Sequence, residues 1–451
     1  MKIKSRAKNY FNENARFQAL NILYQIEYQE GYSNVLINES LKNSQLNSAD
    51  QRLMTQLVYG CLQRKLTLNY YFELLTKGKK TDRWVQTLIE MSLYQLIFLD
   101  RVPDHAVINE AVEIGKINGH QGLAKFINAI LRKFQRDWLP VDLGKIDKEE
   151  IRYSIPQWII DELESVYPGS DIDKLLKSFN EKAYVSARIN PEKKMSQSAV
   201  IQALKEEGYQ VEPGVLSNEA VRSLKGNLAD SQVFKKGLIT IQDESSMLVA
   251  PLGRLAGDEH VLDPCAAPGG KATHIAGLLD RGQVTAIDVS AEKINKLDEN
   301  RKRLGLEDRL HLKLADARKF KPDSSSLYDR IYLDAPCSGL GLLRRKPEIR
   351  YSQTPQSVAA LQVIQEQIIE NVEQYLKVGG ILIYSTCTLT RGENEEAIER
   401  FLKKYSNYSV LAITPDEVRN PELITSDGFI RVWPNQFQTD GFFIARIIKN
   451  S

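Results

Sequence analysis

The chain has 451 residues, of which 42% are hydrophobic and 26% are charged, the balance of an ordinary globular protein with two or three domains. It has no apolar run long enough to cross a membrane, its basic N-terminus lacks the apolar stretch of a signal peptide, and its four cysteines form no zinc-like pairs. We therefore expect a cytoplasmic monomer with free thiols, with neither a membrane nor a metal as partner.

The positive charge of the chain is concentrated near its N-terminus. Residues 1–140 contain 19 Lys and Arg against 13 Asp and Glu, whereas the whole chain has a net charge of only +2. Such a local surplus would attract a polyanion, although a solvated helical surface explains it equally well.

Residues 1–140 are expected to be helical throughout. Apolar residues recur at spacings of three and four in the segments 15–23 and 53–62. The segment 88–99 is more apolar, which predicts a central buried helix.

Three segments of this region resemble the NusB family of small all-α RNA-binding domains: Leu57 to Gly60, Ile108 to Val112 and Phe126 to Arg132. The resemblance implies an RNA-binding domain over residues 1–140. The apolar stripes by themselves would fit any helical bundle, since most of their residues are core positions.

Residues 141–236 are predicted to form a small α+β module that binds RNA or links the flanking domains. Ser154 to Pro156 has the composition of a helix start, and Ala183 to Asn190 alternates like a strand that stops at Pro191. A further helix is expected over 200–207. Nothing in this module suggests catalysis.

From residue 237 onward, strand-like and helix-like segments alternate, which predicts a mainly parallel sheet. The segment Asp243 to Ser246 offers a helix N-cap before Met247. Strands are expected at 238–241, 261–263, 283–287, 310–314, 330–333 and 381–384, and a hairpin at 429–433 and 442–447. An antiparallel hairpin that closes a parallel sheet is typical of S-adenosylmethionine-dependent methyltransferases rather than dehydrogenases. We therefore expect a Rossmann-like methyltransferase domain over residues 237–451.

The most informative stretch follows the strand that ends at Asp263. A turn with two prolines and two glycines leads into a helix that begins near Lys271. A strand, a loop and a helix N-terminus in this order hold nucleotide-like ligands in open α/β sheets. Gly269 and Gly270 let a ligand lie against the backbone, and the free N–H groups favour an anion. A dinucleotide site would fit this arrangement too, but the spacing Gly-x-Gly-x-x-Gly is missing.

An acidic residue follows or ends each of four predicted strands: Asp263, Asp288, Asp316 and Asp334. The carboxyl ends of parallel strands open on one crevice, where ligands bind in such sheets. Asp288 is suited to accept hydrogen bonds from both hydroxyls of a ribose, and Asp316 can reach an adenine amino group. Each could be only a helix N-cap, but four in register favour a ligand site.

Two cysteines follow the ends of neighbouring predicted strands, Cys337 after the fourth and Cys387 after the fifth. Carbon 5 of a pyrimidine is a poor nucleophile until a thiolate adds to carbon 6. Asp334 is placed to form a hydrogen bond at ring nitrogen 3, which would ease that addition. A free cysteine is more often a packing residue, yet three of the four cysteines lie in loops at this crevice. The residues alone do not show which thiol attacks.

Cys265 to Lys271, Asp334 to Cys337 and Thr386-Cys387 resemble the glycine-rich, Pro-Cys and Thr-Cys motifs of the RNA cytosine-5 methyltransferases, and Gln242 to Ser246 also matches. With the NusB-like domain, the resemblance implies methylation of carbon 5 of a cytosine in small-subunit (16S) ribosomal RNA, with S-adenosylmethionine as the cofactor. It implies Cys387 as the nucleophile, Cys337 as a residue that assists product release, and Asp334 and Lys271 as further catalytic residues. The cofactor contacts that it implies are Cys265, Ala266, Ala267, Pro268, Gly269, Gly270, Lys271, Asp288, Asp316 and Asp334.

A basic cluster, Arg344, Arg345 and Lys346, follows Cys337 and is expected to contact RNA phosphates, with a solvated charged loop as the plain alternative. The target base would have to be unstacked to reach the pocket. Two other functions stay open. One is a methyltransferase of the same family that acts on transfer RNA, against which the NusB-like domain argues. The other is a non-catalytic RNA-binding assembly factor, which the glycine loop, carboxylates and thiols disfavour.

Overall fold

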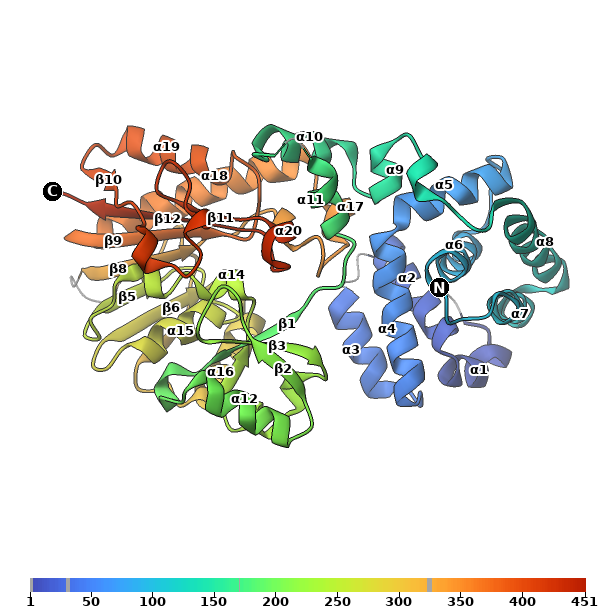
Figure 1. The fold of residues 1–451 in the computed structure, drawn as a ribbon, viewed down its shortest axis with the longest axis horizontal. Coiled ribbons are helices and arrows are strands. Elements are labelled where there is room, and N and C mark those ends of the chain that lie inside the picture. The colour runs from blue at the N-terminus through green and yellow to red at the C-terminus, as the bar shows by residue number, and fades with distance from the viewer. Residues whose placement is uncertain (1–2, 30–32, 170, 323–326) are drawn as a thin grey trace. The chain divides into compact units, whose positions relative to one another are not determined.

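The computed structural model describes residues 3–29, 33–169, 171–322 and 327–451. The chain divides into two compact units (Figure 1). One contains Met1–Asp161 together with Lys346–Ser352, and the other contains Glu162–Arg345 together with Gln353–Ser451. No helix within these described ranges is long and apolar enough to span a membrane.

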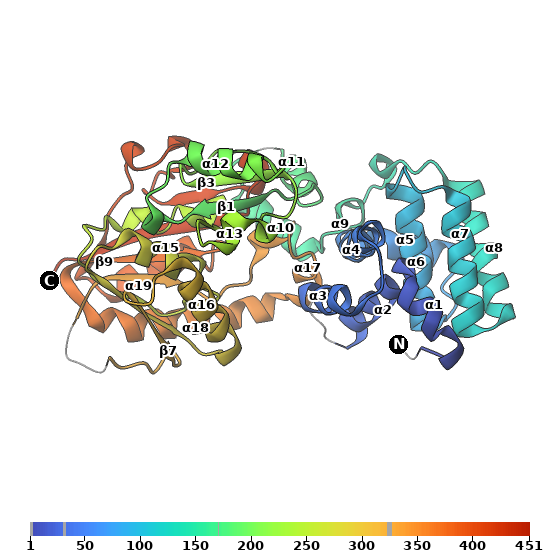
Figure 2. The same cartoon turned by 90° about the horizontal axis from the view of Figure 1, so that it is seen from below.

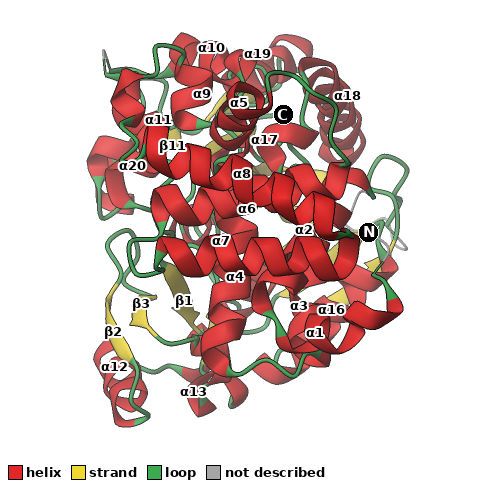
Figure 3. Cartoon of the chain, turned by 90° about the vertical axis from the view of Figure 1, so that its right-hand side faces the viewer, coloured by secondary structure: helices red, strands yellow, loops and turns green. Residues whose placement is uncertain are grey.

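The first unit is a helical bundle, which confirms the all-α prediction for residues 1–140 (Figure 3). Its main helices are α1 (Lys8–Glu13), α2 (Ala15–Tyr28), α3 (Ser33–Asn43), α4 (Ser48–Gln63), α5 (Lys65–Thr76), α6 (Arg83–Phe98), α7 (Asp104–Ile114) and α8 (Gln121–Trp138), with the short α9 (Glu149–Tyr153) after them. α6 is the central helix that the apolar segment 88–99 predicted, since Val85, Leu88 and Leu93 are fully buried. Figure 3 shows α6, α7 and α8 packed side by side.

A short segment from the second half of the chain also belongs to this unit. α17 (Ile349–Ser352) is held there by Arg350, whose side chain is fully buried. The Arg350 guanidinium donates to the backbone oxygens of Gln63, at 2.8 Å, and Ser154, at 3.0 Å. The residues that follow Cys337 therefore lead into the helical unit, a connection that local sequence patterns do not reveal.

The boundary between the units falls within α10 (Gln157–Val166). The second unit continues with α11 (Ile172–Ser178) and then forms a small antiparallel sheet. The sheet has the order β2-β3-β1-β4 and contains β1 (Val185–Ile189), β2 (Gln210–Pro213), β3 (Ala220–Lys225) and β4 (Ile239–Ile241). α12 (Gln197–Glu206) and α13 (Gln232–Lys235) pack on it (Figure 2). The α+β prediction is confirmed. However, the strand expected at 238–241 in the catalytic domain pairs with β1 and completes the small sheet, because strand partners are set by long-range packing.

The described strands after β4 form an eight-stranded sheet with the order β10-β12-β9-β8-β5-β6-β7 and β11 beside β12. They are β5 (His260–Asp263), β6 (Gln283–Asp288), β7 (Leu310–Leu314), β8 (Tyr328–Asp334), β9 (Leu376–Thr386), β10 (Tyr408–Val410), β11 (Ile430–Val432) and β12 (Phe442–Lys449). β5 to β9 pair in parallel, whereas β12 is antiparallel to β9, β10 and β11, as the predicted terminal hairpin requires.

Helices cover both faces of this sheet: α15 and α16 pack on one face, and α18 and α19 pack on the other. Its central strands are therefore buried on both sides. Val261 and Leu262 are adjacent on β5, yet they belong to different hydrophobic clusters because neighbouring side chains on a strand point to opposite faces. The helices are α14 (Glu244–Met247), α15 (Gly270–Leu278), α16 (Ala291–Leu304), α18 (Pro355–Val372), α19 (Glu395–Lys404) and α20 (Pro434–Phe437). Asp243, in the segment predicted to supply a helix cap, caps α14, which begins three residues earlier than the predicted helix at Met247. The carboxyl ends of the parallel strands lie at one edge of the sheet, where the predicted site residues are found.

Candidate active site

The loop between β5 and α15 has the backbone of a ligand-binding turn. Gly269 precedes the helix in the left-handed region, with φ at +106°. A Cβ atom at this position would lie 2.2 Å from Cδ1 of Leu297, so only glycine fits here. α15 begins at Gly270, and its first N–H groups face the loop side, where an anionic group of a ligand is favoured. We call residues Cys265 to Lys271 the donor loop.

Two carboxylates, Asp263 and Asp288, accept hydrogen bonds from backbone N–H groups of the donor loop. Asp288 accepts from the backbone N–H of Ala267 at 3.3 Å and from that of Ser290 at 2.9 Å. The sequence left open that Asp288 is only the N-cap of the following helix. In the structure, Ser290 is the N-cap of α16. Asp263 accepts from the backbone N–H of Cys265 at 3.3 Å through Oδ1.

Asp263 places a buried carboxyl group at this site. The residue is 1% exposed, and its Oδ2 atom has no hydrogen-bond partner among the described residues. Burial, and then the charge of Asp334, raise the pKa of the Asp263 carboxyl to about 8. A cationic group of a bound ligand would supply the missing partner.

Asp316 lies two residues beyond β7 and is engaged by a neighbour. Arg318 donates to both of its carboxylate oxygens, and this contact lowers the pKa of Asp316. Val289 and Leu314, at the ends of β6 and β7, are 72% and 59% exposed, and a pocket of about 550 Å³ includes Leu314 and Asp316. Exposed apolar side chains beside two carboxylates suit a flat heterocycle. The sequence analysis missed both apolar residues, which only their exposure reveals.

Lys271 and Asp334 form an ion pair across the crevice. Lys271 Nζ lies 2.7 Å from Asp334 Oδ2 and 4.9 Å from the centre of the Phe442 ring, while Ser385 donates to Asp334 Oδ1 at 3.0 Å. Burial acts to lower the pKa of Lys271, but the Asp334 carboxylate outweighs it and raises that pKa. The Lys271 ammonium group, a hydrogen-bond donor, and the Asp334 carboxylate, a hydrogen-bond acceptor, therefore lie next to each other in the site.

The two predicted cysteines meet beside this pair. Asp334 and Ser385 are register partners on β8 and β9, so the loops that follow these strands start next to each other. The Sγ atoms of Cys337 and Cys387 lie 3.4 Å apart. The hydrogen bond to Cys387, and then burial, raise the pKa of the Cys337 thiol well above its usual value. Cys337 therefore holds its proton more tightly than a free thiol does, and its sulfur lies within hydrogen-bonding distance of the sulfur of Cys387.

A buried glutamate, which the sequence analysis missed, ties the two thiol loops together. Glu393 is fully buried and accepts from the N–H of Ser338 at 2.9 Å and from its hydroxyl at 2.5 Å. It also accepts from Gln365 at 3.0 Å and from Thr390 at 2.9 Å. Ser338 in turn contacts the hydroxyl of Thr388 at 2.7 Å. Glu393 therefore holds Ser338, the residue after Cys337, directly, and Thr388, the residue after Cys387, through the Ser338 hydroxyl.

The basic cluster after Cys337 is mostly structural, which corrects the prediction. Arg344 is 4% exposed and donates to the backbone oxygens of Ser178 and Pro434, both at 2.8 Å. Arg345 forms ion pairs with Asp243 at 2.6 Å and Asp440 at 2.7 Å. These guanidinium groups hold protein segments together instead of facing RNA. Lys346 is exposed and still fits the expectation.

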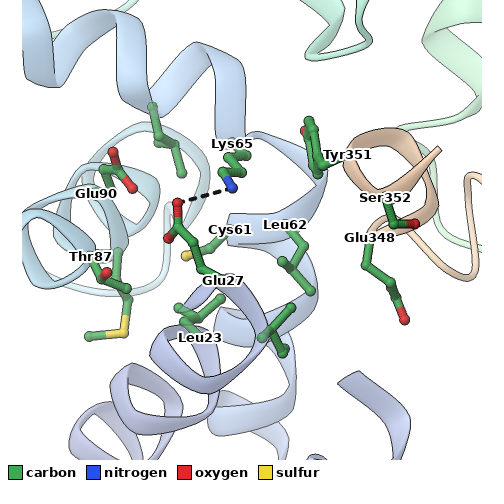
Figure 4. Close-up of a pocket in the computed structure, with 13 residues that line it drawn as sticks. Leu23, Glu27, Cys61, Leu62, Lys65, Thr87, Glu90, Glu348, Tyr351 and Ser352 are labelled. Atoms are coloured by element: carbon green, nitrogen blue, oxygen red, sulfur yellow. Dashed lines mark ion pairs between the residues drawn. The ribbon is translucent and has the colours of Figure 1, made fainter. Parts of the chain in front are cut away.

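A pocket of about 490 Å³ lies within the helical unit and is distinct from this site (Figure 4). Aliphatic side chains such as Leu23 and Leu62 line it, together with a Glu27–Lys65 ion pair of 3.0 Å. Burial raises the pKa of Glu90 in its wall to about 8. Within the described ranges, no group of three or more His, Cys, Asp and Glu residues is arranged to hold a metal ion.

The fold and the site together define a class. A parallel sheet with an antiparallel β12, a glycine-rich loop after its first strand and carboxylates at successive strand ends are the features of a Rossmann-like methyltransferase. The crystal structure of PH0851 matches with a TM-score of 0.81 and 23% identity, covering 96% of this chain and 98% of that one, which supports the fold. The structure of NSun6 from Pyrococcus horikoshii with SFG matches at 0.58 and 24% identity, covering 66% of this chain and 98% of that one.

Family models match all three parts of the chain. Residues 13–136 match the NusB family, residues 155–227 the ferredoxin-like domain of RsmF/B-like methyltransferases, and residues 252–448 the 16S rRNA methyltransferase RsmB/F model. The chain is 39% identical to the probable ribosomal RNA small subunit methyltransferase B of Bacillus subtilis, covering 96% of this chain and 98% of the relative. The corresponding protein of Synechocystis is 35% identical, with 96% and 99% covered. The chain belongs to the ribosomal RNA small subunit methyltransferase B family. Both resemblances noted in the sequence are confirmed at the level of the family.

Proposed function

We propose that this methyltransferase transfers a methyl group from S-adenosylmethionine to carbon 5 of a cytosine in small-subunit ribosomal RNA, through a covalent bond between Cys387 and carbon 6. The observation that carries the proposal is the pair of sulfur atoms 3.4 Å apart, beside the Lys271–Asp334 ion pair. A methyltransferase that acts on a nucleophilic nitrogen or oxygen needs no thiol at this place. Activation of a pyrimidine carbon needs one.

The residues at the donor loop fit the proposed cofactor. The start of α15 would bind its carboxylate, and the unpartnered oxygen of Asp263 its ammonium group. Asp288 would accept from the ribose hydroxyls, and Asp316 from the adenine amino group beside exposed Val289. When bound, S-adenosylmethionine supplies an electrophilic methyl group. The NSun6 structure contains SFG, an analogue of this cofactor, which supports the same use here.

The chain's own residues would carry the remaining chemistry. The Cys387 thiolate adds to carbon 6, and the electron pair of the 5,6 double bond moves onto carbon 5, which becomes the nucleophile. Asp334 and Lys271 would hold the nitrogen 3 edge of the ring, because their ion pair offers both a donor and an acceptor. After methyl transfer, loss of the carbon 5 proton restores the double bond as the carbon–sulfur bond breaks, and Cys387 leaves as a thiolate.

The electrostatics of the thiols favour this division of roles. Burial and the contact with Cys387 raise the pKa of the Cys337 thiol, so Cys337 would be the proton donor in the contact between the two sulfur atoms and Cys387 the acceptor. Once Cys387 is bonded to the base, its charge no longer disfavours ionisation of Cys337. Cys337 then becomes the better base for the proton on carbon 5.

RNA binding is proposed for the helical unit and for Lys346. α8 exposes Lys125, Arg132 and Arg136, in the part of the chain with the positive surplus. Contacts of such residues with phosphates position an RNA without reading its sequence. Ribosomal RNA, and not transfer RNA, is the proposed substrate because the relatives that match along their whole length are named for the small ribosomal subunit.

Mapping of modified nucleosides tests the proposal. Small-subunit ribosomal RNA and transfer RNA would be purified from a strain that lacks the gene, incubated with the enzyme and labelled cofactor, digested, and analysed by mass spectrometry. We expect label in 5-methylcytosine from ribosomal RNA only. Label in another nucleoside would refute the carbon 5 chemistry, label in transfer RNA alone would favour the alternative substrate, and no label in either would favour the non-catalytic assembly factor.

A further inference from the structure

Strand β1 of the small antiparallel sheet divides its side chains between two partners. Ala187 and Ile189 point into the module's own hydrophobic cluster. The alternate residues Ser186, Arg188 and Asn190 face the catalytic domain, as the two-residue period of a strand requires. Ser186, for example, donates to the backbone oxygen of Gln242 at 2.8 Å.

Arg188 contacts the helix that carries the donor loop. Its side chain is fully buried, and Nε donates to Oε1 of Gln242 at 2.8 Å. Nη2 donates to the hydroxyl of Thr273 at 3.2 Å and reaches the backbone oxygen of Gly270 at 3.5 Å. The Thr273 hydroxyl donates in turn to the backbone oxygen of Gly269 at 2.6 Å. The side chain of Thr273 therefore links Arg188 to Gly269 of the donor loop.

The residues after Arg188 fix the same two helices further along. Asn190 donates to the backbone oxygen of Leu304, at the end of α16, at 3.0 Å. Pro191 packs so closely on Gly277 of α15 that a Cβ there would lie 3.1 Å from the proline ring. The end of β1 thus braces α15 and α16, the helices that follow β5 and β6. Both of these strands end in carboxylates of the donor site.

We propose that Arg188 is a positioning residue for the methyl donor, supplied by the ferredoxin-like module to the glycine-rich loop of the catalytic domain. A buried guanidinium is costly unless it forms hydrogen bonds. Nε and Nη2 of Arg188 form theirs with Gln242 and Thr273, whereas Nη1 has no partner among the described residues, so the contacts that hold Arg188 are those that lead to the loop. Its positive charge beside the start of α15 adds to the field that favours a carboxylate there. The module then has a role in cofactor binding, beyond any contact with RNA. This inference rests on the proposed function, because it concerns the same donor loop.

Calorimetry of S-adenosylhomocysteine with the full-length enzyme tests the proposal. Arg188→Met should weaken binding about tenfold or more, since the charge and the hydrogen bonds to Thr273 and Gln242 are lost. Arg446→Met is the matched control, because Arg446 is also fully buried but pairs with Glu417, away from the donor loop. It should lower the thermal unfolding midpoint while the dissociation constant stays within about twofold of the wild type.

A milder variant keeps the test decisive if Arg188→Met does not fold. Thr273→Val removes the hydroxyl that links Arg188 to Gly269 with almost no change in volume. It should weaken cofactor binding and raise the KM for the cofactor while kcat for saturating cofactor changes less than twofold. In the double variant the two losses should be less than multiplicative, since both break one chain of contacts. Unchanged affinity in Thr273→Val, or equal losses in Arg188→Met and Arg446→Met, would overturn the proposal. Failure of the wild-type enzyme to bind the ligand at all would instead refute the proposed function.

Discussion

Cys337 and Cys387 are 50 positions apart in the chain, yet their sulfur atoms lie within 3.4 Å of each other. Two features produce this proximity. β8 and β9 are parallel neighbours in register at Asp334 and Ser385, and Glu393 holds the loops that follow them. The sheet therefore builds a two-thiol site from residues that have no local relationship in sequence.

Asp288 should be needed for cofactor binding. Asp288→Ala removes an acceptor proposed for the ribose and one that holds the Ala267 N–H, so affinity for S-adenosylhomocysteine should fall about tenfold to a hundredfold. Calorimetry measures the affinity, and the far-ultraviolet circular dichroism spectrum should match that of the wild type. A dissociation constant that does not change would show that Asp288 only supports the backbone.

Cofactor binding should release a proton from Asp263. In the free enzyme the pKa of this carboxyl is raised to about 8, so it is protonated at pH 7, and the cofactor's ammonium would favour its ionised form. Affinity should therefore rise as the pH increases from 6 to 8 and level off above. Titrations of S-adenosylhomocysteine in buffers with different ionisation enthalpies measure the proton release, which Asp263→Asn should abolish. Proton uptake would contradict the assignment.

The same carboxyl should affect the stability of the free enzyme. The pKa of Asp263 is about 8 in the folded state and about 4 in the unfolded state. The stability that this carboxyl contributes is therefore fully present below about pH 4 and is lost as the pH rises from about 4 to about 8. Asp263→Asn should flatten the pH dependence of the unfolding midpoint over this range. An equal slope in both proteins would exclude Asp263 as its source.

Glu393 should stabilise the site more than its neighbours on the surface do. Glu393→Gln replaces one of the two acceptor oxygens by an NH2 group, so two of the four buried hydrogen bonds from Ser338, Gln365 and Thr390 lose their acceptor. We therefore expect a loss of about 2 kcal/mol or more in the free energy of unfolding. Alkylation of Cys337 by iodoacetamide should also become faster. Glu399→Gln, on the exposed side of α19, is the control and should change neither quantity. Equal effects of the two variants would exclude the clamp role.

Arg345 and Lys346 should behave differently although they are adjacent. Arg345→Met leaves Asp243 and Asp440 as unpaired buried carboxylates and should cost about 3 kcal/mol of stability. Lys346→Met should leave stability unchanged and reduce the salt dependence of RNA binding by about one phosphate contact. Denaturant unfolding and RNA binding at several salt concentrations separate the two effects. A stable Arg345→Met enzyme with a reduced salt slope would restore the original prediction.

Elements defined by local patterns could be predicted from the sequence. The strands that end near Asp263, Asp288 and Asp334 are short apolar runs followed by polar turns, and these features depend on nearby residues only. The shared crevice then follows from the rule that parallel strands open at one edge. From this rule, the sequence alone predicts that the four carboxylates and both thiols lie at one edge of the sheet.

Features that depend on distant partners could not be predicted. The segment of β4 is a plausible strand in either sheet, and only its pairing with β1 decides between them. Arg345 is part of a basic run, and its partner Asp440 is 95 positions away. The roles proposed for the two thiols rest on the contact between their sulfur atoms, which no spacing encodes. In each case the sequence gives the chemical group but not its environment.

The central claim is a covalent bond from Cys387 to the target base, and denaturing electrophoresis of enzyme mixed with ribosomal RNA and cofactor tests it most directly. The account predicts that Cys337→Ala accumulates a protein–RNA adduct that survives denaturation, because attack proceeds while release stalls. Cys387→Ala should form no adduct and should lose turnover, and the double variant should behave like Cys387→Ala. An adduct formed by Cys387→Ala and absent from Cys337→Ala would reverse the roles of the two thiols. Full activity in both single variants would contradict the thiol mechanism itself.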